Sequence, residues 1–304
     1  YGDILLIQTN EVIFNNGADG EKGYRAHFSH DNEVAEPGYY KVHLDSTEIG
    51  VELTVSKRSG IQKYKFSEGS KQIVILDLEH RDEVLDSKVN MYSDTEIGGH
   101  RHSKAWATDQ YLFFNMEFSR PFKNITFLND VNEGKKVKVA FEFDPSESNI
   151  LEIKVGISPV DEEGARKNRR EELDGKSFEQ VKNEAQNIWE QQLEKIVVES
   201  DNDDYKTNFY TSMYHVSIAP NLYQDVDGRY RGMDLEIHQT TNFDYYTVFS
   251  LWDTYRAAHP LYTIIEEEKT NDFINTFIAK YDEGGIIFQE HFDVLPSGIL
   301  RSVA

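Results

Sequence analysis

The hydrophobic pattern of this chain changes period near Pro159, and this change limits the folds open to it. Residues 1–160 consist of short segments in which apolar and polar residues alternate or β-branched residues recur, separated by turns such as Ser59-Gly60. A period of two residues is typical of strands with one solvated face. Many strands without intervening helices predict an antiparallel β-sandwich. The segments expected as strands are DILLIQT, YYKVHL, IGVELTVS, QKYKFS, QIVILDLE, QYLFFNMEFS, KKVKVAFEF and LEIKVGIS.

Beyond Pro159 the apolar residues recur at helical spacing. Residues 161–199 are expected to form a helical linker, whose second helix opens with a capping box at Ser177 and Gln180. Residues 200–304 read as helices joined by long structured loops, which suits the beginning of an α/α barrel or a solenoid. About four helices fit this stretch, so we expect any such barrel to be incomplete. The sequence thus predicts a multidomain α+β protein in three parts.

The charge balance excludes several classes of partner. The formal net charge is −22, whereas a nucleic-acid partner or an anionic membrane surface requires a basic footprint. The longest apolar runs fall short of the roughly 18 residues needed to span a membrane. The chain has no cysteine, which excludes zinc–thiolate sites, cysteine nucleophiles and disulfides. We therefore expect a globular protein without a membrane span and without a nucleic-acid partner.

Residues 246–260, YTVFSLWDTYRAAHP, form the window with the most chemistry in the helical part. Trp252 and Asp253 are adjacent, and Tyr255 and Arg256 follow. An indole ring can cover the apolar face of a sugar, and a carboxylate can accept hydrogen bonds from its hydroxyls. The alternative is an amphipathic core helix that carries an Asp253–Arg256 surface pair.

Three other windows have competing interpretations. Asp225-Val-Asp-Gly228 resembles part of a calcium loop, but it lacks the remaining EF-hand acids and is better interpreted as a tight turn. His27, Ser29, His30 and Glu33 are expected in a polar loop before Pro37, where they could line a site or form turn hydrogen bonds. A second cluster could bind a ligand or form cross-strand pairs: His100, Arg101, His102, Lys104, Trp106 and Asp109.

Several long windows, in this order, resemble the family 92 glycoside hydrolases, which are calcium-dependent, exo-acting α-mannosidases. The resemblance extends over roughly residues 1–285, and its length makes a chance match improbable. The windows are GYRAHFSHDNEVAEPGYYKVHLD, IGVELTVSKRSGIQKYKF, DLEHRDEVLDSKVNMYSDTEIGGHRHSKAWATDQY, FYTSMYHVSIAPNLYQDVDGRYRGMD and YTVFSLWDTYRAAHPL.

The resemblance implies a β-sandwich domain at 1–160, a helical linker at 161–199 and the start of a C-terminal (α/α)6 barrel at 200–304. It implies calcium-dependent hydrolysis of terminal α-linked mannose, α-1,2 as the expected linkage, with inversion of configuration. The substrate would be a mannose-containing oligosaccharide in an extracytoplasmic compartment, either periplasmic or secreted. The residues implied for substrate binding are Trp252, Asp253, Thr254 and Arg256; no metal ligand is identified.

The chain departs from the family pattern after Gly285. No Asn-Glu-Thr type motif for the general acid follows, so we expect a central fragment of such an enzyme, with the acid and the base outside this chain. Glu290 is a weak substitute candidate for the acid. The alternative function is a non-catalytic carbohydrate-binding or structural fragment. We also expect apolar faces of an incomplete barrel, such as Phe273/Phe277 and 286–288, to favour self-association.

Overall fold

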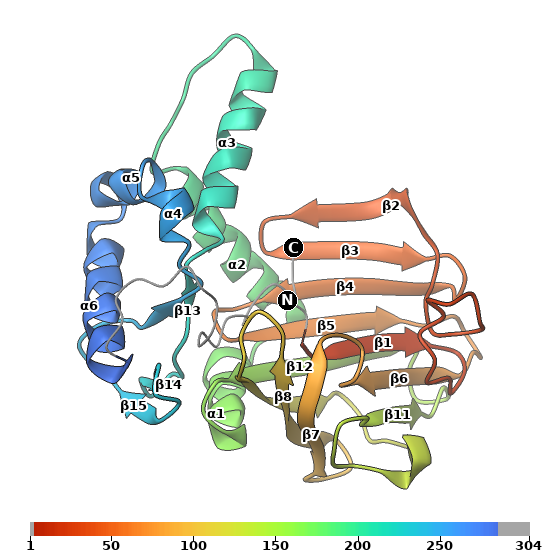
Figure 1. Ribbon diagram of the computed structural model, residues 1–304. Helices are drawn as coiled ribbons and strands as arrows, with labels where there is room; N and C mark the ends of the chain where they lie inside the picture. The colour runs from red at the N-terminus through yellow and green to blue at the C-terminus, as the bar shows by residue number, and fades with distance from the viewer. Residues whose placement is uncertain (1–2, 285–304) are drawn as a thin grey trace.

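The computed structural model describes residues 3–284, which form a β-sandwich followed by helices (Figure 1). Within these residues, an eight-stranded antiparallel sheet has the order β2-β3-β4-β5-β12-β9-β8-β7 and faces a four-stranded sheet with the order β1-β6-β11-β10. The eight strands of the larger sheet are β2 Phe28–Glu36, β3 Tyr39–Leu44, β4 Ile49–Val55, β5 Ser59–Lys65, β7 Glu83–Met91, β8 Glu96–Lys104, β9 Gln110–Phe118 and β12 Ile150–Ser158. The smaller sheet contains β1 Leu5–Thr9, β6 Gln72–Asp77, β10 Asn124–Phe127 and β11 Lys138–Phe143.

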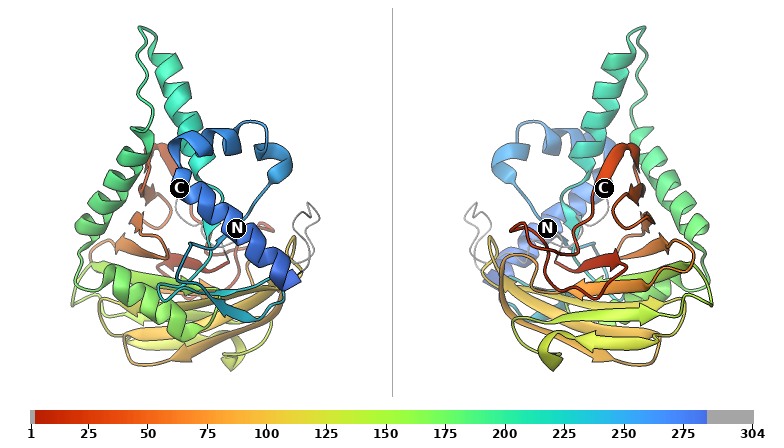
Figure 2. Two further views of the ribbon diagram at one scale, coloured as in Figure 1. Left: turned by 90° about the vertical axis from the view of Figure 1, so that its left-hand side faces the viewer. Right: turned by 90° about the vertical axis from the view of Figure 1, so that its right-hand side faces the viewer.

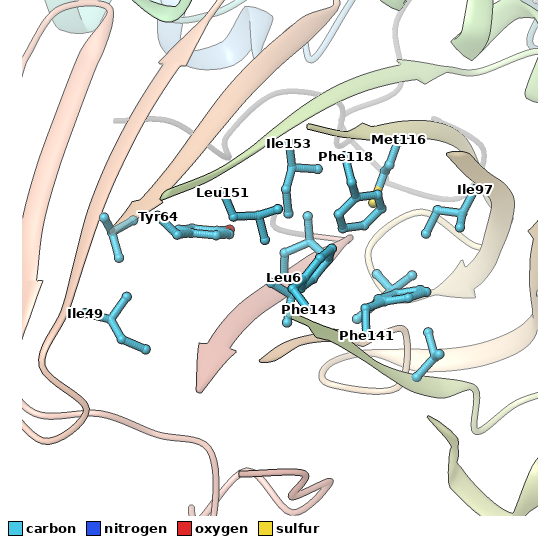
Figure 3. Close-up of a cluster of buried hydrophobic side chains, with 14 of the residues drawn as sticks. Leu6, Ile49, Tyr64, Ile97, Met116, Phe118, Phe141, Phe143, Leu151 and Ile153 are labelled. Atoms are coloured by element: carbon cyan, nitrogen blue, oxygen red, sulfur yellow. The ribbon is translucent and has the colours of Figure 1, made fainter. Parts of the chain in front are cut away.

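The core of the sandwich lies between the two sheets, where side chains of alternate residues meet (Figure 3). Phe118 of β9 lies 5.3 Å from Phe141 and 5.7 Å from Phe143 of β11, measured between ring centroids. These rings join the larger sheet to the smaller one. The β-sandwich predicted from the two-residue period is confirmed.

Some strands lack the alternating pattern and escape sequence prediction. The stretch around His30 and Glu33 was expected as a loop, but it forms β2 at the edge of the larger sheet. Most side chains of β2 are exposed, so burial imposes no apolar period on it. His30 Nδ1 lies 2.5 Å from Glu33 Oε2.

Two helices cover the outer face of the larger sheet. α1 Glu162–Leu173 packs against β12 and β9, and Gly156 permits the close approach, since a Cβ there would lie 2.3 Å from the carbonyl oxygen of Ala165. α2 Phe178–Leu193 opens with the predicted capping box, in which Ser177 and Gln180 exchange hydrogen bonds. Its buried face, including Phe178 and Val181, contacts Tyr39 and Ile61 of the sheet. Together these helices connect the sandwich to the helical part.

The remaining helices form the beginning of a second layer beside the sandwich (Figure 2). They are α3 Asp203–Ser217, α4 Leu251–Thr254, α5 Ala258–Ile265 and α6 Glu267–Gly284. Four short strands lie between α3 and α4: β13 Asn221–Leu222, β14 Arg229–Arg231, β15 Ile237–Gln239 and β16 Tyr246–Thr247. A short 3-10 helix, η1 Leu128–Asp130, belongs to the sandwich. α3 is capped by Asn202, and not by either neighbouring aspartate, because the Asn202 side chain accepts the Asp204 and Tyr205 N–H groups. Within residues 3–284, every helix is too short or too polar to span a bilayer.

The faces of α6 differ in part from expectation. Phe273 is buried and Phe277 packs against Phe249, so this pair does not form an exposed face. Ile274 and Ile278 of the same helix are 51% and 55% exposed. The expected patch at 286–288 lies outside the described residues.

Arg231 of β14 connects the hairpin of β14 and β15 to the end of the sandwich. The Arg231 guanidinium donates hydrogen bonds to the carbonyl oxygens of Pro159 at 3.0 Å and Val160 at 3.1 Å. Its charge lies 4.7 Å from the ring centroid of Tyr111 on β9. We call these contacts the Arg231 clamp; they fix the start of the helical part against the end of the sandwich.

Candidate functional site

The predicted substrate-binding residues lie on one exposed turn. α4 is a four-residue helix, Leu251–Thr254, and the Trp252 side chain is 75% exposed. Asp253 is exposed beside it, and its Oδ2 accepts a hydrogen bond from Ser250 Oγ at 2.5 Å. Thr254 Oγ1 donates to the Ser250 carbonyl oxygen at 2.9 Å. An indole ring and a carboxylate are therefore presented together to solvent.

The alternative interpretation of this window, a core helix with an Asp253–Arg256 pair, is wrong. The Arg256 side chain instead contacts its neighbour Tyr255, whose hydroxyl accepts from Nε at 2.5 Å. The window is also not one helix, since the chain turns between Thr254 and α5. Pro260 lies in the first turn of α5, where its missing N–H is tolerated, whereas inside a continuous helix its ring would clash with the preceding turn.

Backbone strain precedes this turn. Val248 has a φ of +62°, in the left-handed region that a β-branched residue rarely adopts. Such a conformation costs on the order of 1–3 kcal/mol and persists only where the surroundings hold it. This backbone reversal ends β16 and begins the turn that carries Trp252.

An aromatic cluster on α6 and α5 packs against Phe249, which immediately precedes the turn. Phe249 lies 4.5 Å from Phe277 and 5.4 Å from Phe273, between ring centroids. The Lys280 Nζ lies 4.8 Å from the Phe249 ring, and burial lowers the pKa of Lys280 to about 7. Burial also lowers the pKa of His259, which packs in the same cluster. The residue that leads into the exposed turn is thus packed against a buried cluster.

The second cluster of the sequence analysis resolves into structural pairs. His100 Nε2 lies 2.9 Å from Asp86 Oδ2, and His102 Nε2 lies 2.9 Å from Asp109 Oδ1. Arg101 is fully buried, and its guanidinium donates to the carbonyl oxygen of Leu78 in the segment after β6. Lys104 is exposed at the end of β8, and Trp106 is 63% exposed in the following loop. The cross-strand interpretation accounts for His100, which pairs with Asp86 of β7, and for His102, which stacks on Tyr111 of β9; Arg101 instead contacts segments outside the strands.

The Asp-Gly window is the predicted tight turn, with one feature that the sequence did not indicate. The Gly228 N–H donates to the Asp225 carbonyl oxygen at 2.9 Å, and Gly228 has a φ of +81°. The Asp225 carboxylate is fully buried and accepts hydrogen bonds from Ser158 Oγ and Asn168 Nδ2, both at 2.8 Å. Burial raises its pKa to about 6. The sequence carries no sign of this burial, because a tight turn is enough to explain an aspartate three residues before Gly228.

The described part of the chain offers no assembled metal site. Within residues 3–284, no group of three histidine, cysteine, aspartate or glutamate side chains could hold a metal ion. These residues therefore do not fit a calcium site by themselves. Glu290, the weak candidate for the general acid, lies outside the described residues.

Comparison with known proteins identifies the family. The family model described as the glycosyl hydrolase family 92 N-terminal domain matches residues 1–158, and that of the glycosyl hydrolase family 92 catalytic domain matches residues 164–293. The chain belongs to glycosyl hydrolase family 92. This membership confirms the resemblance inferred from the sequence windows.

Solved family 92 structures match most of the chain. A family GH92 alpha-mannosidase from Bacteroides thetaiotaomicron is 32% identical with a TM-score of 0.88, over 93% of this chain and 41% of its own. A complex of that protein with mannoimidazole is also known. A family GH92 inverting mannosidase from the same species is 22% identical with a TM-score of 0.81, over 93% of this chain and 39% of its own, and shows a common fold. The described sandwich and helices thus correspond to part of family 92 structures that contain an (α/α)6 barrel.

A fungal relative matches less of the chain. An uncharacterized secreted glycosidase of Arthroderma benhamiae is 24% identical over 230 residues, which are 65% of this chain and 30% of the fungal protein. This family 92 chain therefore spans well under half the length of both the bacterial mannosidases and the fungal glycosidase.

Proposed function

We propose that the complete enzyme containing this chain is a glycoside hydrolase that releases terminal α-linked mannose, preferentially α-1,2-linked, from oligosaccharides. The observation that carries this proposal is the 32% identity and TM-score of 0.88 to an alpha-mannosidase over 93% of this chain. The mannoimidazole complex of that relative supports a mannose-like ligand. We further propose the division into a sandwich domain at 1–160, a helical linker at 161–199 and a partial barrel at 200–304.

The turn at 250–256 is proposed to bind the terminal sugar. The Trp252 ring would cover an apolar face of the mannose, and Asp253 would accept hydrogen bonds from its hydroxyls. Thr254 and Arg256 would add donors at the same edge. The support for this assignment is that the fold places Trp252 and Asp253 together on a solvent-exposed turn with a packed base.

Inversion of configuration requires two carboxyl groups about 6.5–9.5 Å apart, one to protonate the leaving oxygen and one to activate water. We propose inversion for the complete enzyme and assign neither group within residues 3–284. Calcium dependence is likewise proposed for the complete enzyme, and no described residue is assigned as its ligand. The compartment is proposed to be periplasmic or extracellular, which agrees with the secreted fungal relative.

A second candidate function is carbohydrate binding without catalysis by this chain alone. The exposed Trp252–Asp253 pair favours it, because binding needs an aromatic platform and hydrogen-bond acceptors but no acid or base. Mannose release from α-1,2-mannobiose by the 304-residue chain, with calcium or with chelator, distinguishes the two. Stabilisation by mannobiose without release would support the binding module.

The site assignment is tested in the complete enzyme with Asp253→Asn. Removing one charge-assisted hydrogen-bond acceptor should lower kcat/KM for mannobiose about tenfold to a hundredfold. Asp282→Asn, an equally conservative change on the exposed surface of α6, is the control and should leave turnover unchanged. Unchanged turnover in Asp253→Asn would remove this residue from the site.

A further inference from the structure

A polar pocket lies away from the turn at 250–256 along the chain. It has a volume of about 490 Å³ and is bounded by the turn before β14, the segment after β15 and the first half of α6. This volume falls within the range of about 300–1,000 Å³ typical of small-molecule sites. Its lining residues are Gln224, Val226, Asp227, Gly228, Thr240, Thr241, Asn242, Phe243, Asp244 and Asp272.

The polar groups of this pocket are held in place by the fold. Gln224 is buried, and its side chain donates to Asp244 Oδ1 at 2.9 Å and accepts the Tyr245 N–H at 2.7 Å. The Asp272 carboxylate accepts the N–H of Asp244, so α6 and the segment after β15 are joined at the pocket wall. Asp244 and Asp272 therefore present carboxylate oxygens from a fixed frame.

The chemistry of the lining favours a neutral, hydroxyl-rich ligand. Asp227 is already paired with Lys167 at 3.2 Å and with Arg229 at 3.0 Å. In the part of the chain that the structure describes, the pocket carboxylates form no group that could hold a metal ion. What remains is two carboxylate acceptors, the neutral donors of threonine and asparagine side chains, and the Phe243 ring. Acceptors and donors of this kind pair with sugar hydroxyls, and a ring packs on sugar C–H groups.

We propose that this pocket is a second saccharide site, which binds a mannose residue of the oligosaccharide independently of the turn at 250–256. The proposal rests on the proposed function for the class of saccharide. Asp244 and Asp272 accept hydroxyl hydrogens, Asn242 and Thr241 contact the ring oxygens and remaining hydroxyls, and Phe243 covers the apolar edge.

The test measures the affinity of the 304-residue chain for α-1,2-mannobiose by calorimetry and by saturation-transfer NMR. Two binding events are expected for the unchanged chain. Asp253→Asn should remove the one at 250–256 and leave the pocket event. Asn242→Ala and Asp244→Asn should each weaken the pocket event at least about tenfold, the effect of one lost hydrogen bond to a charged or well-placed polar group.

Asn242 is exposed and serves as the second variant if Asp244→Asn disturbs the fold, which the melting temperature reports. If mannobiose binds in a single event that only Asp253→Asn removes, the assignment of the pocket as a saccharide site is overturned, whereas the proposed function is retained. The same assignment is overturned if Asn242→Ala and Asp244→Asn leave mannobiose binding unchanged, or if the chain binds no mannobiose. If the pocket bound calcium but no sugar, and Asp244→Asn abolished the calcium binding, the saccharide assignment would be overturned and the pocket would be a cation site. The proposed function is judged separately, by mannose release from the complete enzyme.

Discussion

Arg101 lies at the centre of a buried charge network in the sandwich. Its guanidinium donates to Asp3 Oδ1 at 2.6 Å, to the carbonyl oxygen of Leu78 at 2.9 Å and to that of Arg81. Asp3 also accepts from Gln110 Nε2 at 2.6 Å. Burial raises the pKa of Asp3 and lowers that of Arg101, so each charge depends on the other. Removing one partner of such a buried pair destabilises the fold, because the other charge is then left buried without compensation.

Arg101→Met is expected to lower the free energy of unfolding by about 3–5 kcal/mol, because it leaves the Asp3 carboxylate buried and uncompensated. Urea denaturation followed by tryptophan fluorescence measures the loss. Arg25→Met, at an exposed position, is the matched control and should change stability by less than about 0.5 kcal/mol. Equal effects of the two substitutions would contradict the role given to Arg101.

Asp225 should make the stability of the protein depend on pH. Its folded pKa of about 6 exceeds the unfolded value of about 3.9, so the folded state binds its proton more tightly. The resulting stability is fully present below about pH 3.9 and is lost as pH rises through about 6. The groups facing the carboxylate are Ser158, Asn168, Asp227 and Arg229.

Relative to Asp225→Asn, the unchanged protein should lose roughly 2 kcal/mol of unfolding free energy between about pH 4 and pH 7, from a shift of about two pKa units. Urea denaturation of both proteins at the two pH values measures this difference. The comparison cancels the groups that titrate in both proteins. A difference between the two proteins that stays constant with pH would show that Asp225 keeps an ordinary pKa.

At the scale of elements, the predictability of each segment follows its burial. β3, β4 and β9 bury alternate residues of one face, so their apolar period marks them in the sequence. β2 is a largely exposed edge strand, and β8 carries the buried polar residue Arg101, so their sequences lack that period. The α2 capping box was predictable because all its partners lie within four residues.

The candidate site divides in the same way. The turn with Trp252 and Asp253 is local, so its chemistry could be predicted from one window, although the φ of Val248, which begins the turn, could not. The polar pocket could not be predicted, because Gln224, Asp244 and Asp272 meet only after the hairpin and α6 have packed.

The cap of α2 provides a test at this scale. Ser177→Ala removes the side-chain acceptor of the Gln180 N–H and should lower the free energy of unfolding by about 1 kcal/mol. Ser212→Ala, on the exposed surface of α3, is the control, where alanine also improves helix propensity. Thermal and urea denaturation compare the two. A Ser177→Ala protein as stable as the control would rule out a stabilising cap.

At the scale of the whole molecule, α6 has two apolar faces. Phe273 and Phe277 face the cluster beneath the turn at 250–256, whereas Ile274, Ile278 and Tyr281 follow one another on the exposed side, each more than half exposed. Exposed apolar stripes on a helix commonly mark surfaces that pack against another element. Ile264 of α5, at 79% exposed, is a further exposed apolar side chain in the helical part.

The 304-residue chain is therefore expected to self-associate through this stripe. The double substitution Ile274→Lys and Ile278→Lys should shift the protein toward monomer, because burying two ammonium groups against a second copy is unfavourable. Sedimentation velocity over a range of concentrations measures the shift. Val197→Lys, at a position 75% exposed outside α6, is the control. An unchanged chain that stays monomeric throughout would refute the expectation.

The Arg231 clamp has a consequence for the order in which the protein is made. Its partners Tyr111, Pro159 and Val160 all precede Arg231 in the chain, and the carbonyl of Leu235, to which Arg231 also donates, follows by four residues. The contact can close as soon as the ribosome has released this hairpin, before α6 has emerged from the ribosome. Domains generally fold from the N-terminus during synthesis. The nascent sandwich would then already hold the anchor against which the later helices assemble.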